Sequence, residues 1–182
     1  MADPAERTDE IDAVDEIVTQ WNTERPDVDV SPLHVLGRLH RSYAAYLASI
    51  TVVLEHRGLN VPAFDVLATL RRSGDPFRMT AGELASASLV STGGVTLRVD
   101  RLETAGLVVR RRTGADRRIV HIQLTPLGRE LIDSVIDDHF TNEARMLHEL
   151  STDEQRTLAA LLSRLEKSIH TSTVPTPPGD IR

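Results

Sequence analysis

The sequence predicts a mainly α-helical fold with one small β-hairpin, and three patterns carry this prediction. Apolar residues recur at spacings of three and four over most of the chain, which is typical of helices that bury one face. Hydroxyl side chains, prolines and glycines stand where such helices should begin and end. Two strand-like runs, LVVRRR and RIVHIQL, flank the short turn sequence TGAD, as expected for a hairpin.

The N-terminal part of the chain predicts a short helix followed by a long one. Residues 9–21 place apolar side chains on one side of an amphipathic helix, and the polar stretch 22–30 links it to the next element. Ser31 and Pro32 supply an N-cap and a first helical residue for a long helix, which should end near Gly58.

The middle of the chain predicts three short helices and then the hairpin. The first opens at Pro62, and the second begins with the capping-box spacing of Thr80 and Glu83. The third runs from a cap at Ser91 to Ala105. A helix, a turn and a second helix followed directly by a small hairpin form a winged helix-turn-helix.

The C-terminal part predicts two more helices and an irregular tail. Thr125 and Pro126 start one helix, and Ser151 with Glu154 starts the last, with its leucines turned inward. We therefore divide the chain into an acidic N-terminal arm with an added helix (1–30), a long scaffold helix (31–57), the winged helix-turn-helix (58–124), C-terminal helices (125–170) and a disordered tail (171–182).

Charge is separated along the chain although the net charge is -6. Residues 1–30 hold ten acidic side chains against two arginines, a net of -8, so the remainder is -6 minus -8, or +2. A basic segment at 98–118 predicts a nucleic-acid surface despite the acidic total. Its arginines are Arg98, Arg101, Arg110, Arg111, Arg112, Arg117 and Arg118.

Several classes of function are disfavoured by what the sequence lacks. Without cysteine there is no disulfide, thiolate zinc site or thiol switch within this chain. No apolar run is long enough to span a membrane and no signal peptide is evident, so we expect a cytoplasmic protein without a membrane partner. His139 and Glu143 share a helical face, but no third metal ligand and no catalytic motif accompany them, so we expect no enzyme activity, metal or cofactor.

The predicted DNA-binding residues lie on the second helix of the helix-turn-helix and on the hairpin. Small side chains that form hydrogen bonds let a helix approach the major groove closely, and arginines reach phosphates, guanine edges or the narrow minor groove. The expected contacts are Ser91, Thr92, Gly93, Thr96, Arg101, Arg112, Arg117 and Arg118.

The segment STGGVTLRVDRLETAGLVVRR, the following DRR and the later LTPLGREL together resemble the MarR family of regulators over about residues 33–168. The resemblance implies a homodimer held by the helices at 31–57 and 125–170, which binds a near-palindromic operator in double-stranded DNA, usually as a repressor. It also implies that Arg117 reaches the minor groove.

The N-terminal helix and the sequence FDVLATLRRSG further resemble the urate-responsive PecS/HucR-like branch of that family. This resemblance implies a ligand site built from Trp21, Asp65, Arg98 and Arg110. The side-chain types suit such a ligand, because an indole stacks on a flat ring and an arginine pairs with an anionic edge. A ligand that competes for Arg98 would tilt the groove-reading helix and weaken DNA binding.

Other interpretations of these residues remain open. Trp21 can be a packing residue, and Asp65 with Arg98 can be a structural ion pair between helices. The regulator can respond to another phenolic or lipophilic compound instead of urate. The winged helix can also serve protein contacts, although such a wing needs fewer arginines.

Overall fold

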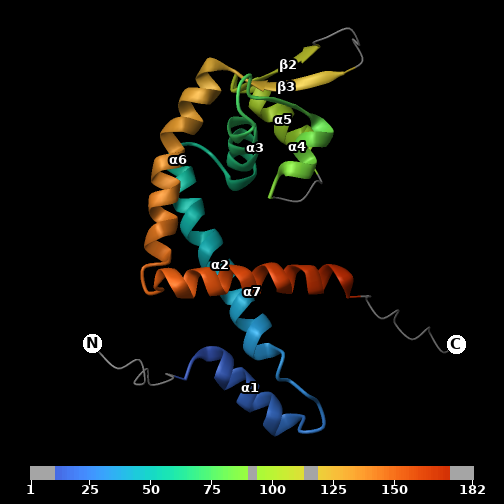
Figure 1. Cartoon of the computed structure of the whole chain (residues 1–182), viewed down its shortest axis with the longest axis vertical. Helices are drawn as coiled ribbons and strands as arrows, with labels where there is room; N and C mark the ends of the chain where they lie inside the picture. The colour runs from blue at the N-terminus through green and yellow to red at the C-terminus, as the bar shows by residue number, and fades with distance from the viewer. Residues whose placement is uncertain (1–10, 90–93, 113–118, 173–182) are drawn as a thin grey trace, which may run out of the picture. The chain divides into compact units, whose positions relative to one another are not determined.

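The computed structural model describes residues 11–89, 94–112 and 119–172 and contains two compact units, Met1–His139 and Phe140–Arg182. Helices dominate, and the predicted fold class is confirmed: α4 and α5 form the helix-turn-helix and β2 and β3 form the wing (Figure 1). The elements are α1 (Ala13–Glu24), α2 (Leu33–Glu55), α3 (Val61–Arg72), β1 (Arg78–Thr80), α4 (Ala81–Ala87), α5 (Val95–Thr104), β2 (Val108–Arg112), β3 (Val120–Leu124), α6 (Pro126–Met146) and α7 (Thr152–Thr171).

Helix α1 begins later than the sequence analysis expected, because Asp12 caps it. One carboxylate oxygen of Asp12 accepts the backbone N–H groups of Val14 at 2.7 Å and Asp15 at 3.1 Å. The Asp15 carboxylate accepts the N–H of Asp12 in return, at 3.2 Å, which completes a capping box. Val14 packs on α2 where Gly37 leaves room, since a Cβ at Gly37 would lie only 3.1 Å from a Val14 methyl carbon.

The core of the first unit is built around α3. Val66, Leu67 and Leu70 on this helix are fully buried. Leu54 at the end of α2 and Leu84 of α4 join them. The remaining core side chains come from α5, the sheet and α6: Val95, Val99, Leu102, Leu107, Val108, Ile122, Leu124, Ile132 and Val135.

The wing belongs to a three-stranded antiparallel sheet with strand order β1-β3-β2. The two predicted strands pair as expected, with Val109 opposite Gln123 and Arg112 opposite Val120. The sequence analysis missed β1, whose three residues are too few to show an alternating pattern. The turn sequence TGAD at 113–116 lies outside the described residues.

Helix α5 begins at Val95, which is later than the predicted cap at Ser91. Gly94 precedes it as the N-cap with a φ of 84°, in the left-handed region. A residue in this conformation cannot continue a right-handed helix, and glycine adopts it without a steric penalty. Gly94 therefore stands before the helix rather than inside it.

The second unit contains the end of α6 and α7. The predicted capping box of α7 is present, since the Glu154 carboxylate accepts the Ser151 N–H at 2.8 Å and the Ser151 hydroxyl accepts the Glu154 N–H at 3.4 Å. The expectation of inward-facing leucines is not met within the chain. No residue of α7 is buried, and Leu161 is 52% exposed.

We predict that Gly128→Ala destabilises the protein strongly. Gly128 lies on α6 against the backbone of Leu107, and an added Cβ would stand 2.0 Å from the Leu107 carbonyl oxygen. Overpacking against backbone should lower the free energy of unfolding by about 3 kcal/mol in urea titrations. Gly82→Ala on α4 is the matched control, because its Cβ would meet nothing within 4 Å. Equal stabilities of the two variants would contradict the prediction.

Candidate functional site

Helix α5 presents a polar face opposite its core face. Val95, Val99 and Leu102 are buried, whereas Thr96 and Arg101 are exposed. This separation follows from the helical repeat, and it leaves both predicted DNA-binding residues of the helix open to a ligand or a nucleic acid. The helix thus has one face that fixes it to the domain and another available for recognition.

The wing continues this exposed surface. Arg112, at the end of β2, is exposed and lies on the same side of the strand as Arg110, because alternate residues share a face. The other predicted DNA-binding residues lie outside the described residues, so their placement stays a prediction. They are Ser91, Thr92, Gly93, Arg117 and Arg118.

Arg110 ties the wing to α5. Its guanidinium donates to the Asp100 carboxylate at 2.5 Å and also to Glu103. Its backbone N–H donates to Glu103 at 2.8 Å. Hydrogen bonds from Arg110, first the backbone one, hold the pKa of the Glu103 carboxyl below its usual value. A ligand anion that uses Arg110 must therefore compete with two carboxylates of α5.

Asp65 is a buried carboxylate on α3 that contacts the turn after α4. It is 7% exposed, and one of its oxygens accepts the backbone N–H of Leu89 at 3.1 Å. Arg98 is half-buried on α5, which packs against α3. The predicted ligand residues Asp65, Arg98 and Arg110 thus come from three elements that share one core.

Trp21 lies apart from these three residues within the chain. It is 49% exposed on α1, and α1 docks near Gly37 and Arg38 at the start of α2. Arg38 marks the end of α2 where α1 docks, and Leu54 marks the end that enters the core. The two residues are sixteen positions apart, which corresponds to about 24 Å along the helix at 1.5 Å per residue. Figure 1 shows α1 beside one end of α2 and α3 to α5 near the other.

An open hollow of about 510 Å³ lies on the face of the wing sheet opposite the one that carries Arg110 and Arg112. Phe77, Arg111 and Arg129 are among its lining residues, and none of the four predicted ligand residues lines it. Two guanidinium groups lie over the Phe77 ring, that of Arg71 at 5.0 Å and that of Arg129 at 4.7 Å from the ring centre. Aromatic and cationic side chains thus form part of the wall of this hollow, a feature that the sequence analysis did not identify.

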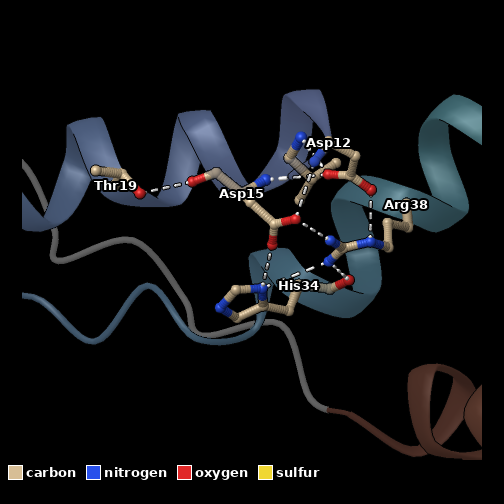
Figure 2. A network of polar contacts seen from close by, with 6 residues as sticks. Asp12, Asp15, Thr19, His34 and Arg38 are labelled. Atoms are coloured by element: carbon tan, nitrogen blue, oxygen red, sulfur yellow. Dashed lines mark hydrogen bonds and ion pairs between the residues drawn. The ribbon is translucent and has the colours of Figure 1, made fainter. Parts of the chain in front are cut away.

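A charged network that the sequence analysis missed attaches α1 to α2 (Figure 2). The Arg38 guanidinium donates to Asp12 at 2.9 Å and to Asp15 at 2.8 Å. His34 lies 3.4 Å from the second oxygen of Asp15. The hydrogen bond from Arg38 is the first cause that lowers the pKa of Asp15 from its ordinary value of 3.8. Asp15 and Arg38 are twenty-three positions apart in the sequence, so no local signal indicates this contact.

We predict that acid releases α1 from α2. A carboxyl with a lowered folded pKa stabilises the docked state above its unfolded pKa, and that contribution is lost as the pH falls through the folded value. Docking should therefore persist at neutral pH and weaken below pH 3.8, the ordinary value for Asp15. Amide hydrogen exchange in α1 should report this, with fluorescence of Trp21, the chain's single tryptophan, as a second probe.

Arg38→Met should weaken the docking of α1 at neutral pH, so that amide hydrogen exchange in α1 becomes faster. Arg25→Met is the matched control, since its guanidinium pairs with Asp27 inside the α1–α2 connection and does not bridge the helices. Unchanged exchange in α1 of Arg38→Met would count against the network as the attachment.

The His139 ring packs in the core. It is 5% exposed, and its ring centre lies 4.4 Å from that of Phe64. Within the described ranges, no group of three or more histidine, aspartate or glutamate side chains is placed to hold a metal ion. A search of the same ranges finds no helix long and apolar enough to cross a membrane.

Comparison with known proteins gives consistent matches. A family model described as MarR family matches residues 57–119. The HTH-type transcriptional regulator PecS of Dickeya dadantii is 40% identical over 156 residues, which cover 86% of this chain and 94% of PecS. A solved mutant of MarR from Escherichia coli, in complex with operator DNA, is similar with a TM-score of 0.65 and 26% identity, covering 76% of this chain and 99% of that chain.

A third similarity concerns the fold alone. AbsC, a MarR family transcriptional regulator from Streptomyces coelicolor, matches with a TM-score of 0.69 at 22% identity. The match covers 79% of this chain and 97% of that chain.

Proposed function

Because the chain belongs to the MarR family of DNA-binding transcriptional regulators, we propose that it is a homodimeric repressor released from its operator by a small anionic aromatic ligand such as urate. The observation that carries the DNA part is the exposed polar face of α5 beside the arginine-bearing strand β2. MarR-family proteins are regulators rather than enzymes, so the chemistry to explain is binding and release.

In the proposed complex, α5 enters the major groove and the wing follows the backbone into the minor groove. Thr96 and Arg101 face bases and phosphates, and Arg112 contacts phosphate at the base of the wing. The proposal assigns the same surface to Ser91, Thr92, Gly93, Arg117 and Arg118. Arg110 is not needed for DNA contact, since Asp100 and Glu103 already hold it.

The proposed homodimer accounts for the apolar face of α7. A helix with no buried residue is stable only if something covers its apolar stripe, since exposed apolar patches are typical of interfaces. The stripe includes Leu158, Leu161, Leu162 and Ile169, all at least 41% exposed. A second copy offers an identical stripe, which suits a two-fold interface.

The proposed ligand site combines residues of two copies. Asp65, Arg98 and Arg110 come from elements that share one core, whereas α1 docks at the opposite end of α2. Trp21 can therefore stack on a ligand near Asp65 only if a second copy supplies it. Asp65 would accept ring N–H groups and the arginines would pair with the anionic edge. The alternative effector is a different phenolic or lipophilic compound.

We expect Arg117→Ala to remove the shifted band in a mobility-shift assay, run at a protein concentration just sufficient for the unmodified protein to bind DNA from upstream of the gene. Removal of an arginine from the minor groove should weaken binding by roughly 1–3 kcal/mol, or about five- to 150-fold. Arg25→Ala is the control, because it removes one positive charge from the α1–α2 connection. Equal binding by both variants would remove the wing from the mechanism, and no DNA binding by the unmodified protein would favour a protein-interaction module.

We also expect urate to release the DNA in the same assay, and Trp21→Ala to require more urate for release without losing DNA affinity. The reason is that the indole supplies stacking to the ligand and is not among the side chains proposed to contact DNA. Salicylate provides the comparison ligand. Release by salicylate with no effect of urate would reject the urate assignment in favour of a phenolic effector.

A further inference from the structure

Helix α3 carries a polar stripe beside its core face. Asp65, Thr69 and Arg72 are separated by four and three residues, so they lie on one side of the helix. Two of them are buried, with Asp65 7% and Thr69 1% exposed. Buried polar groups are costly unless they are hydrogen-bonded, so such a stripe needs partners.

Those partners are backbone groups of the turn between α4 and α5. The Arg72 guanidinium donates to the carbonyl oxygen of Ala87 and to the Thr69 hydroxyl, the latter at 3.1 Å. The Asp65 carboxylate accepts the N–H of Leu89 at 3.1 Å. Ala87 ends α4, and Leu89 is the last residue that the structure describes before it resumes at Gly94. The side chains of this stripe therefore form hydrogen bonds with the first and the last residue of the segment 87–89.

We propose that Asp65, Thr69 and Arg72 form a turn anchor that positions α5 for DNA binding, with Arg72 as its main positioning residue. The peptide groups of an irregular turn lack the regular partners of a helix, so side chains must fix them. The anchor sets where the chain leaves α4 and thereby the angle at which α5 meets the groove. A rigid placement of this kind raises affinity because less freedom is lost on binding.

This inference rests on the proposed operator binding, and one alternative must be separated from it. Arg72 is an exposed residue and could contact a phosphate directly. A direct contact releases counterions, so its loss lowers the slope of log Kd against log salt by about one. A positioning role leaves that slope unchanged while weakening binding at every salt concentration.

The first test measures operator affinity by fluorescence anisotropy over a salt series, with a labelled duplex from upstream of the gene. Arg72→Gln should weaken binding about tenfold with an unchanged slope, the order expected for one hydrogen bond to a charged group. Arg71→Gln is the matched control, because the neighbouring guanidinium pairs with Asp133 on α6 instead of the turn. Unchanged affinity in Arg72→Gln, or a slope lowered by one, overturns the proposal.

The second test keeps Arg72 and adds a readout that needs no DNA. Thr69→Val keeps the side-chain shape but removes the hydroxyl that accepts from Arg72. We expect faster amide hydrogen exchange at Leu89 in this variant. We also expect about two- to threefold weaker operator binding, a smaller loss than in Arg72→Gln, because the Thr69 hydroxyl is neutral whereas the Arg72 guanidinium is charged. Exchange at Leu89 equal to that of the unmodified protein overturns the anchor, whereas failure of the unmodified protein to bind DNA counts only against the proposed function.

Discussion

Burial of the apolar face of α3 is the constraint on which the DNA-binding unit depends. Val66, Leu67 and Leu70 meet side chains from α2, α4, α5 and the sheet in one cluster. Full burial of each such side chain contributes about 1.5–3 kcal/mol, whereas a typical hydrogen bond contributes about 1 kcal/mol. The apolar face therefore decides that these elements come together. The directional polar contacts beside it decide the angles at which they do so.

Charged side chains likewise contribute to the geometry of the fold more than to its stability. The acidic arm and the basic segment look like opposing features in the sequence, yet each is partly neutralised where it lies: Arg38 pairs with Asp12 and Asp15, and Arg110 pairs with Asp100 and Glu103. Exposed ion pairs of this kind contribute little to the free energy of unfolding, because water and salt screen them. Their importance is geometric, because they hold α1 on α2 and the wing on α5.

The sequence predicted the elements that have local signals. The capping boxes at Thr80 and Ser151 and the strand-like runs of β2 and β3 each arise from neighbours in the chain, and all are present. What it missed depends on distant partners. The strand β1 exists because β3 pairs with it, and no local pattern shows that Arg38 bridges to α1 or that Arg72 reaches Ala87. The spacing of Asp65, Thr69 and Arg72 was visible, but its partners were not.

Asp65 connects the proposed ligand site to the turn before α5, the helix that we propose reads DNA. Its carboxylate accepts the Leu89 N–H, so a ligand that takes the same oxygen must compete with the turn. Such competition shifts the equilibrium between the anchored and the released turn only by the difference in ligand affinity between these two states. Typical coupling free energies between two binding sites are about 1–3 kcal/mol. One charged hydrogen bond lies within that range. Under the proposed function, a single shared carboxylate would therefore be sufficient to couple ligand binding to DNA release.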